Sequence, residues 1–262
     1  MKTLDERYVN HKVFSELSRY ADFYRILAFS VWRFCPVGTS AICNFDSYIY
    51  SSMQGTMESI LTILREGRIN DAYALLRKYY DCAVINIYLS LYLKDELNKS
   101  NFIVSAIDDW LKGTAQLPKF RMMVSYVRSS NEVARITQLL EADDRYRRIR
   151  NRCNSHMHYN LFAHALLNDN EVFLKERHRV LDTFSFDVAN LFILHLAYIF
   201  WISEHYMVSS DYVDSLDCGL TPEADSQHWV APFIQEVFDD IITVRRPDIA
   251  AAIKQHTCMH LT

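Results

Sequence analysis

The sequence contains few of the residues that make tight turns. Its 262 residues include five glycines and five prolines. Folds built from β-strands need many turns, whereas long helices need few. We therefore predict an all-α protein. Half of the residues are hydrophobic, so the chain can bury a full core, and its length fits one large domain or two small ones.

The cysteines lack the paired spacing of a disulfide framework. Six are scattered between Cys35 and Cys258, whereas a secreted disulfide-rich domain is shorter and carries them at higher density. Residues 1–7 also lack the apolar run of a signal peptide. We therefore expect reduced thiols and a cytoplasmic protein.

Long apolar runs are missing as well. The most hydrophobic stretch, residues 188–202, is shorter than the roughly 20 apolar residues that cross a membrane. It also contains Asn190 and His195. We expect a buried core helix there and no association with a membrane.

Apolar spacing and capping residues divide the chain into helical segments. One buried face follows the i, i+3, i+4, i+7 rule at Met57, Ile60, Leu61 and Leu64. Gly67 stands where a left-handed residue would end that helix, and the short connector predicts an antiparallel hairpin with the next one. The helices are expected at about residues 4–34, 46–66, 71–97, 102–112, 120–128, 132–142, from 145 onward, 187–208, 226–244 and 247–255.

The protein has no net positive charge, but one segment contains many positively charged residues. The formal net charge is -4, yet five of the eight residues 145–152 are arginine, and His156 and His158 follow. Arginine forks hold phosphate in two-point geometry, and histidine exchanges protons near neutral pH. This combination predicts the cleavage of RNA.

Cleaving RNA without a metal ion needs three kinds of group. A base takes the proton of the 2′-hydroxyl, cations neutralise the charge that develops on the phosphate, and an acid protonates the leaving 5′-oxygen. The candidate catalytic residues are Arg150, Asn151, Arg152, His156 and His158. The candidate substrate-binding residues are Arg147, Arg148, Asn154, Tyr159 and Asn160. We expect neither a metal ion nor another cofactor.

Helical geometry limits which of these side chains can meet. On one continuous helix each residue turns by about 100°, so Arg150 diverges from His156 by about 120°. Arg152 diverges from His158 by the same angle. Either pair converges only if the helix breaks near Asn154 and the serine after it, or if a second copy of the protein contributes. Asparagine and serine compete with the backbone for hydrogen bonds, so such a break is plausible.

The same spacing resembles the signature of the HEPN superfamily, helical nucleotide-binding proteins of which many are RNases. That signature is an arginine, usually followed by a polar residue, and then a histidine after about four to six intervening residues. Arg150 and His156 match it, with Asn151 as the polar residue. Arg152 and His158 also match, although a cysteine follows that arginine. We favour the second pair and keep the first as an alternative.

Residues 152–160 also resemble a family of uncharacterised bacterial proteins. The resemblance extends to residues 74–79 and 254–259. It therefore spans much of the chain, but that family brings no established activity.

The HEPN resemblance implies an antiparallel helical bundle with additional helices. It also implies a homodimer whose two motifs face a shared cleft, and metal-independent RNA cleavage, which we expect to leave a 2′,3′-cyclic phosphate. Such proteins often act as toxins or effectors in bacterial phage defence, so an antitoxin or defence-system protein is an expected partner besides RNA. We expect a single domain over residues 1–262, with a core bundle at about residues 40–210 and the terminal helices packed on it.

Plainer interpretations exist for parts of the arginine-rich stretch. Arg145 and Arg148 can pair with Glu141 and Asp144 on a solvated helix face. A zinc site built from Cys153 and the nearby histidines conflicts with helical geometry, because the rings of a His-x-His on a helix point apart.

Outside that stretch, Arg77 and Asp81 are spaced for an ion pair within one helix, or for support of a catalytic arginine. We expect structural roles for His164, His178 and His195. The alternative function is a non-catalytic module that binds RNA, a nucleotide or a partner protein, as the antitoxin or sensor of a two-gene system does.

Overall fold

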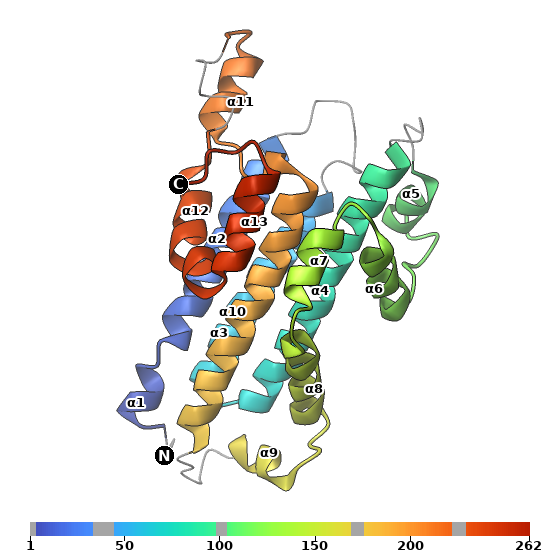
Figure 1. Cartoon of the computed structure of the whole chain (residues 1–262). Coiled ribbons are helices and arrows are strands. Elements are labelled where there is room, and N and C mark those ends of the chain that lie inside the picture. Colours follow the sequence, from blue (N-terminus) through green and yellow to red (C-terminus); the bar gives the residue numbers. More distant parts are fainter. Residues whose placement is uncertain (1–3, 34–44, 98–103, 169–175, 222–228) are drawn as a thin grey trace. The chain divides into compact units, whose positions relative to one another are not determined.

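The chain folds into helices. The computed structural model describes residues 4–33, 45–97, 104–168, 176–221 and 229–262. Within these ranges it contains no strand, apart from an isolated β-bridge between Val208 and Val230, so the predicted all-α class is confirmed. The helices, shown in Figure 1, are α1 (Glu6–Val9), α2 (Val13–Arg33), α3 (Phe45–Arg65), α4 (Ile69–Leu97), α5 (Ser105–Leu111), α6 (Phe120–Ser129), α7 (Ala134–Leu140), α8 (Arg145–Met157), α9 (Phe162–Leu167), α10 (Glu176–Ile202), the 3-10 helix η1 (Glu204–Tyr206), α11 (Ser210–Asp217), α12 (Pro232–Val237), the π-helix η3 (Phe238–Thr243) and α13 (Pro247–His256).

Tertiary contacts divide the chain into two compact units. Unit 1 comprises Met1–Arg25, Tyr50–Ala83 and Asp143–Phe192. Unit 2 comprises Ile26–Ile49, Val84–Ala142 and Ile193–Thr262. The four long helices α2, α3, α4 and α10 each contribute residues to both units. This division does not decide the domain count, so the single domain stays a prediction.

Aromatic side chains hold the helices of unit 1 together. Tyr20 of α2 stacks on Phe192 of α10, with ring centroids 4.4 Å apart. The hydroxyl groups of Tyr24 and Tyr79 hydrogen bond at 2.6 Å, which joins α2 to α4 inside the core. Buried tyrosines need such a partner, because an unpaired buried hydroxyl is costly.

Helix α3 presents the buried face that its sequence predicts. Met57, Ile60 and Leu64 have no exposed surface, whereas Leu61, the fourth predicted member, is half-buried. Gly67 follows the end of α3 with a left-handed φ of 76°, and its amide donates to the Leu64 carbonyl at 2.8 Å. The glycine C-cap is therefore confirmed.

The expected helix over residues 4–34 is divided into α1 and α2. Asn10 is the C-cap of α1, and the side chain of His11 accepts a hydrogen bond from the Val13 amide at 3.1 Å. This side-chain bond satisfies one of the free amides at the start of α2, so a new helix begins there.

Helix α10 begins at Glu176, well before the expected residue 187. The added turns begin with four polar residues and then mix polar residues with the buried Leu181 and Phe184, so they lack the continuous apolar pattern of residues 188–202. Tertiary contacts stabilise them: His178 pairs with Asp5 at 3.0 Å, and Asp182 pairs with His11 at 3.1 Å.

Helix α10 is long and apolar enough to cross a membrane by length and composition. However, 94% of its most apolar window is buried inside the protein, as expected for a core helix.

Unit 2 contains a buried polar network. The Asn86 amide and the Tyr206 hydroxyl each donate to Asp46, both at 2.6 Å. His195 Nε2 donates to the Asn86 side-chain oxygen at 2.8 Å, and His195 is fully buried, in agreement with its predicted structural role. This network holds α3, α4, α10 and η1 together within unit 2.

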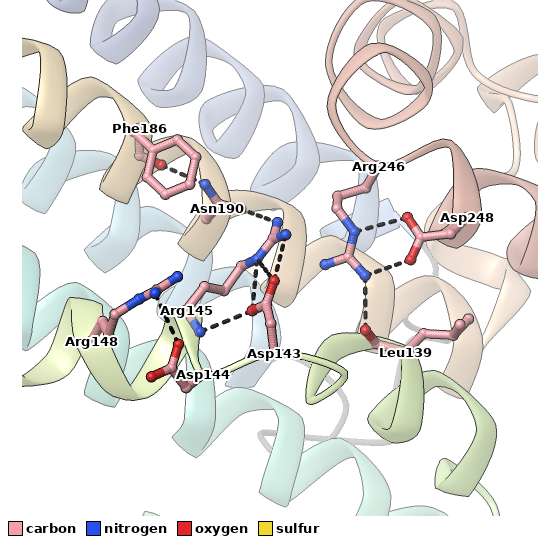
Figure 2. Close-up of polar contacts among 9 residues, drawn as sticks. All are labelled: Leu139, Asp143, Asp144, Arg145, Arg148, Phe186, Asn190, Arg246 and Asp248. Atoms are coloured by element: carbon pink, nitrogen blue, oxygen red, sulfur yellow. Dashed lines mark hydrogen bonds and ion pairs between the residues drawn. The ribbon is translucent and has the colours of Figure 1, made fainter.

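A second polar contact joins α7 to the start of α13 in unit 2. Arg246 donates to the Leu139 carbonyl at 2.8 Å and pairs with Asp248 at 2.6 Å (Figure 2). The residues expected as one helix over 226–244 form α12 and η3, which begin only at Pro232; residues 222–228 lie outside the described ranges.

Candidate functional site

Helix α8 carries the arginine–histidine stretch and lies entirely in unit 1. It is continuous through Asn154 and Ser155, so the first of the two alternatives, a helix break near Asn154, does not occur. The Asn154 side chain accepts a hydrogen bond from Arg77 of α4 at 3.4 Å, and the Ser155 carbonyl accepts one from His164 of α9 at 3.1 Å. Because Arg77 engages the Asn154 side chain, that side chain does not compete for the backbone hydrogen bonds of α8.

The first turn of α8 is fixed by Arg145. Its guanidinium binds the carboxylate of Asp143 at 2.8 Å and donates to the side-chain oxygen of Asn190 at 2.9 Å (Figure 2). Asn190 in turn donates to the Phe186 carbonyl on the same helix, α10, at 2.8 Å. The predicted pairing of Arg145 with Glu141 is therefore wrong, because Arg145 binds the nearer acid and anchors α8 to α10.

The next arginines lie at the surface. Arg147 and Arg148 both pair with Asp144 at 3.1 Å, and their side chains are 75% and 61% exposed. The predicted pairing of Arg148 with Asp144 is confirmed. Ion pairs this exposed contribute at most about 1 kcal/mol, so both arginines can exchange Asp144 for a phosphate.

The last turn of α8 ends in an unusual residue. Tyr159 has a φ of 49° and is the one non-glycine residue with positive φ among those described. Its amide donates to the His156 carbonyl, and the Asn160 amide donates to the Ser155 carbonyl at 3.0 Å. These bonds form the helix-ending motif in which glycine normally takes the left-handed position. A tyrosine there costs about 1–2 kcal/mol relative to the right-handed form.

The side chains of α8 separate into an exposed face and a buried one. Counting about 100° per residue, Arg147, Asn151 and His158 point within about 40° of one another, and all three are exposed. His156 points about 160° from His158 and is buried. The two histidines of the motif therefore have opposite environments.

The Arg152 side chain points from α8 toward α10. Its guanidinium makes two hydrogen bonds to Asp187 of α10, at 2.7 and 2.6 Å. Asp187 is fully buried, and Tyr73 of α4 also donates to it at 3.5 Å. Burial raises the pKa of Asp187, and the hydrogen bonds and charge of Arg152 act in the opposite direction. Arg152 is thus engaged inside unit 1.

His156 is the centre of a three-ring stack. Its ring lies 4.0 Å from that of Tyr73 on one side and 4.0 Å from that of His164 on the other. Asn70 of α4 donates through its amide nitrogen to the His164 carbonyl. Its amide oxygen therefore accepts from His156 Nδ1 at 2.8 Å, which places the ring proton on that nitrogen.

This environment keeps His156 uncharged. Burial, together with the charges of His164 and Arg152, lowers the pKa of His156 to about 3. At neutral pH the ring is a neutral, fully packed side chain. We therefore assign His156 a role in holding α8 against α4 and α9.

Arg150 interacts electrostatically with two residues of α4. Arg77 of α4 pairs with Asp81 at 2.9 Å, as the sequence predicts, and also donates to Asn154. Burial lowers the pKa of Arg77 and raises that of Asp81, while the charge of Arg150 lowers both. Arg150 is therefore close enough to both groups to act on them electrostatically.

His158 and the residues after it are exposed. His158 is the C-cap of α8, and Asn160 is exposed beside it. Tyr159, Leu161 and Phe162 are 49%, 59% and 78% exposed. Exposed aromatic rings are one of the two elements, with cations, that bind single-stranded nucleic acid.

Neither predicted pair converges within one chain, because α8 is unbroken. The residues that the structure adds to the site come from distant segments: Asn70 and Tyr73 of α4, and Asp187 of α10. Arg77 and Asp81 of α4 had a sequence signal, their i, i+4 spacing.

Metal ligation has little support in the described part of the chain. No three His, Cys, Asp or Glu side chains gather there in a metal-binding arrangement. Cys153 is buried, and burial raises the pKa of its thiol to about 12, which disfavours the thiolate that binds metals.

Comparisons with known proteins give no independent guide. No protein-family model matches the chain, and neither a curated protein nor a solved structure does. The resemblance to the HEPN superfamily therefore stays a prediction.

Proposed function

We propose that this protein binds and cleaves RNA as a metal-independent endoribonuclease, with His158 as its proton-transferring residue. The observation that supports the proposal is the placement of His158: it is exposed at the end of α8, on the same face as Arg147 and Asn151. Histidine is the side chain best suited to proton transfer near neutral pH, and the exposed arginines earlier in α8 attract phosphate.

Each residue of the stretch then has a separate role. Arg147, Arg148 and Arg150 bind the RNA backbone, and Asn151 orients the phosphate by hydrogen bonding. Tyr159 stacks on a base, while Asn154 and Asn160 bind the substrate from either side of His158. Arg152 and His156 are positioning residues in this proposal, because their partners are buried.

The reaction requires two proton transfers. The 2′-oxygen attacks phosphorus as a base removes its proton, and the bond to the 5′-oxygen breaks as an acid protonates that oxygen. The products are a 2′,3′-cyclic phosphate and a free 5′-hydroxyl. We infer that a homodimer supplies the second proton carrier, with the His158 of each copy facing one cleft.

The biological setting that we propose follows from the HEPN resemblance. The protein would act in the cytoplasm as a toxin or effector in phage defence, controlled by an antitoxin or defence-system partner. Growth arrest on expression, relieved by His158→Gln, is the expected result.

The direct test is incubation of single-stranded RNA with the purified protein in EDTA. We expect products that end in a 2′,3′-cyclic phosphate and a rate at least about a hundredfold lower in His158→Gln. His260→Gln is the matched control, because His260 is an exposed histidine outside α8. Full activity in His158→Gln, or cleavage of an all-deoxy strand, would disprove the assignment.

A second candidate is RNA binding without cleavage. It is favoured by the engagement of Arg152 with Asp187 and the burial of His156, which leave His158 as the exposed histidine of α8. It predicts salt-dependent binding of RNA that stays intact at every protein concentration. Appearance of a cyclic phosphate product at high protein concentration would exclude it.

A further inference from the structure

Residues 157–165, at the end of α8 and in α9, form a surface of unit 1 that we call the neutral run. All of them are exposed except His164, which is half-buried. Phe162 is 78% exposed and Leu161 is 59% exposed. Single exposed apolar side chains are common on soluble proteins, whereas several that adjoin one another mark a site of interaction.

Polar contacts hold the neutral run in place although its apolar side chains face water. Asn70 of α4 donates to the His164 carbonyl, and the His164 ring bonds the Ser155 carbonyl of α8 at 3.1 Å. Asn168, the C-cap of α9, accepts from the Asn70 amide at 3.0 Å and from Arg68 at 3.1 Å. These contacts restrain α9 against α4 and α8, and a restrained surface loses less entropy when it binds a partner.

The composition of the neutral run indicates the kind of partner. It contains no lysine, arginine, aspartate or glutamate, whereas charged residues make up 23% of the chain. An RNA backbone or an anionic lipid surface is bound through cations, and the run has no lysine or arginine to supply them. The cores of protein–protein interfaces are depleted of charge and enriched in aromatic residues and methionine. The run has this composition, so it fits a protein surface.

The absence of charge also fits a second copy of this chain. In a dimer with two-fold symmetry a patch meets the same patch, so a patch of one charge sign repels itself and an uncharged patch does not. The run includes the proposed proton-transferring residue: Phe162 follows His158 by four residues, which limits their Cα separation to roughly 14 Å. Contact between two copies at Phe162 therefore places both copies of His158 beside the interface.

We propose that the neutral run is the surface on which a second copy of this chain docks, with Leu161 and Phe162 as its anchors. That the docked pair completes a catalytic site rests on the proposed function; the docking itself rests on the exposure, restraint and composition of the run. A standard interface contains roughly 20–30 residues on each side, and the run supplies fewer than half of that number. We therefore expect a weak dimer, with a dissociation constant in the micromolar range.

Sedimentation velocity of the full chain over a range of concentrations tests the docking. The wild type should change from monomer to dimer as its concentration rises. Phe162→Glu places like charges in the interface and should raise the dissociation constant roughly thirtyfold or more, as the loss of a central interface residue does. Phe186→Glu is the matched control, because Phe186 is a 46% exposed aromatic residue of α10 outside the run, and it should leave the dimer unchanged.

A pair of variants guards against loss of folding. Phe162→Glu and Phe162→Lys should each be monomeric alone, and mixing them should restore a dimer, because opposite charges then meet across the interface. Misfolded chains do not produce such a gain. A wild type that stays monomeric at every soluble concentration, or a dimer that persists unchanged in Phe162→Glu, would overturn the docking surface.

RNA cleavage separates the docking surface from the proposed ribonuclease. A wild-type dimer that Phe162→Glu disrupts, without RNA cleavage by either protein, supports the surface and rejects the ribonuclease. RNA cleavage by a wild type that is monomeric throughout rejects the surface alone. If such a monomer binds an uncleavable 2′-O-methyl oligonucleotide and Phe162→Ala weakens that binding, the occupant of the run is RNA and the second copy is rejected.

Discussion

At the scale of single residues, the ion pair between Arg152 and Asp187 connects α8 to α10. Their environments differ: the Arg152 side chain is 32% exposed, whereas Asp187 has no exposed surface. The residues are 35 positions apart in the chain. No local spacing rule relates them, so the sequence alone could not predict that Arg152 pairs with a buried acid.

The unequal burial predicts unequal costs for the two single substitutions. Arg152→Gln leaves Asp187 buried without its cation and should lower the free energy of unfolding by about 3 kcal/mol. Asp187→Asn leaves Arg152, which can reach water, and should cost less, roughly 1–2 kcal/mol. Urea denaturation at neutral pH measures both values, and a larger loss in Asp187→Asn would contradict the argument.

At the scale of elements, α8 is held at both ends and along one side. Arg145 fixes its first turn, His156 packs against α4 and α9, and a left-handed residue ends it at Tyr159. Helical periodicity predicts which residues share a face, but it does not predict which face is buried. That choice depends on the side chains of α4 and α10.

At the end of α8, one substitution is expected to raise stability and to weaken RNA binding. Tyr159→Gly removes the left-handed strain and should raise the free energy of unfolding by up to about 1 kcal/mol, because glycine also gains freedom in the unfolded chain. The same change removes an exposed ring, so RNA binding should weaken by about 1 kcal/mol or more if that ring stacks on a base. Tyr159→Phe is the control and should change neither quantity strongly.

Two other helices show where local rules succeed and fail. The buried face of α3 and its end at Gly67 were predictable, because apolar spacing and glycine's tolerance of positive φ are local properties. The first turns of α10 were not predictable, because His178 and Asp182 are stabilised by Asp5 and His11 at the other end of the sequence.

At the scale of the whole molecule, buried titratable groups make stability depend on pH in two opposing ways. Burial lowers the pKa of His156 and of His195 to about 3. Their unfolded forms bind protons more readily, so stability falls as pH drops from about 6.5 toward 3. Burial raises the pKa of Asp46 to about 6, and hydrogen bonds from Tyr206 and Asn86 act in the opposite direction.

The Asp46 contribution can be isolated by substitution. Because the folded carboxyl holds its proton more tightly than the unfolded one, stability falls as pH rises from about 4 to 6, by about 3 kcal/mol. Asp46→Asn should remove this loss, since an amide can accept from Asn86 and donate to Tyr206. The difference in unfolding free energy between variant and wild type should therefore grow across that window. A constant difference would refute the assignment; the histidine contributions are common to both proteins and cancel.

The proposed homodimer gives a further prediction for the whole molecule. If the His158 side chains of two copies share one site, a mixed dimer with one His158→Gln chain is inactive. An equal mixture of wild type and variant, refolded together, should then retain about a quarter of the wild-type activity. Retention of about half would indicate that each chain acts alone.

The sequence by itself determined the helical class, the buried face of α3 and the concentration of arginine and histidine between residues 145 and 158. Composition, periodicity and glycine conformation act over a few residues, so they can be read directly from the chain. Only the tertiary structure decided that Arg152 meets Asp187 and that His156 is buried while His158 is exposed. Those assignments depend on which distant segments of α4, α9 and α10 pack against α8, and burial there sets the charge and access of each group.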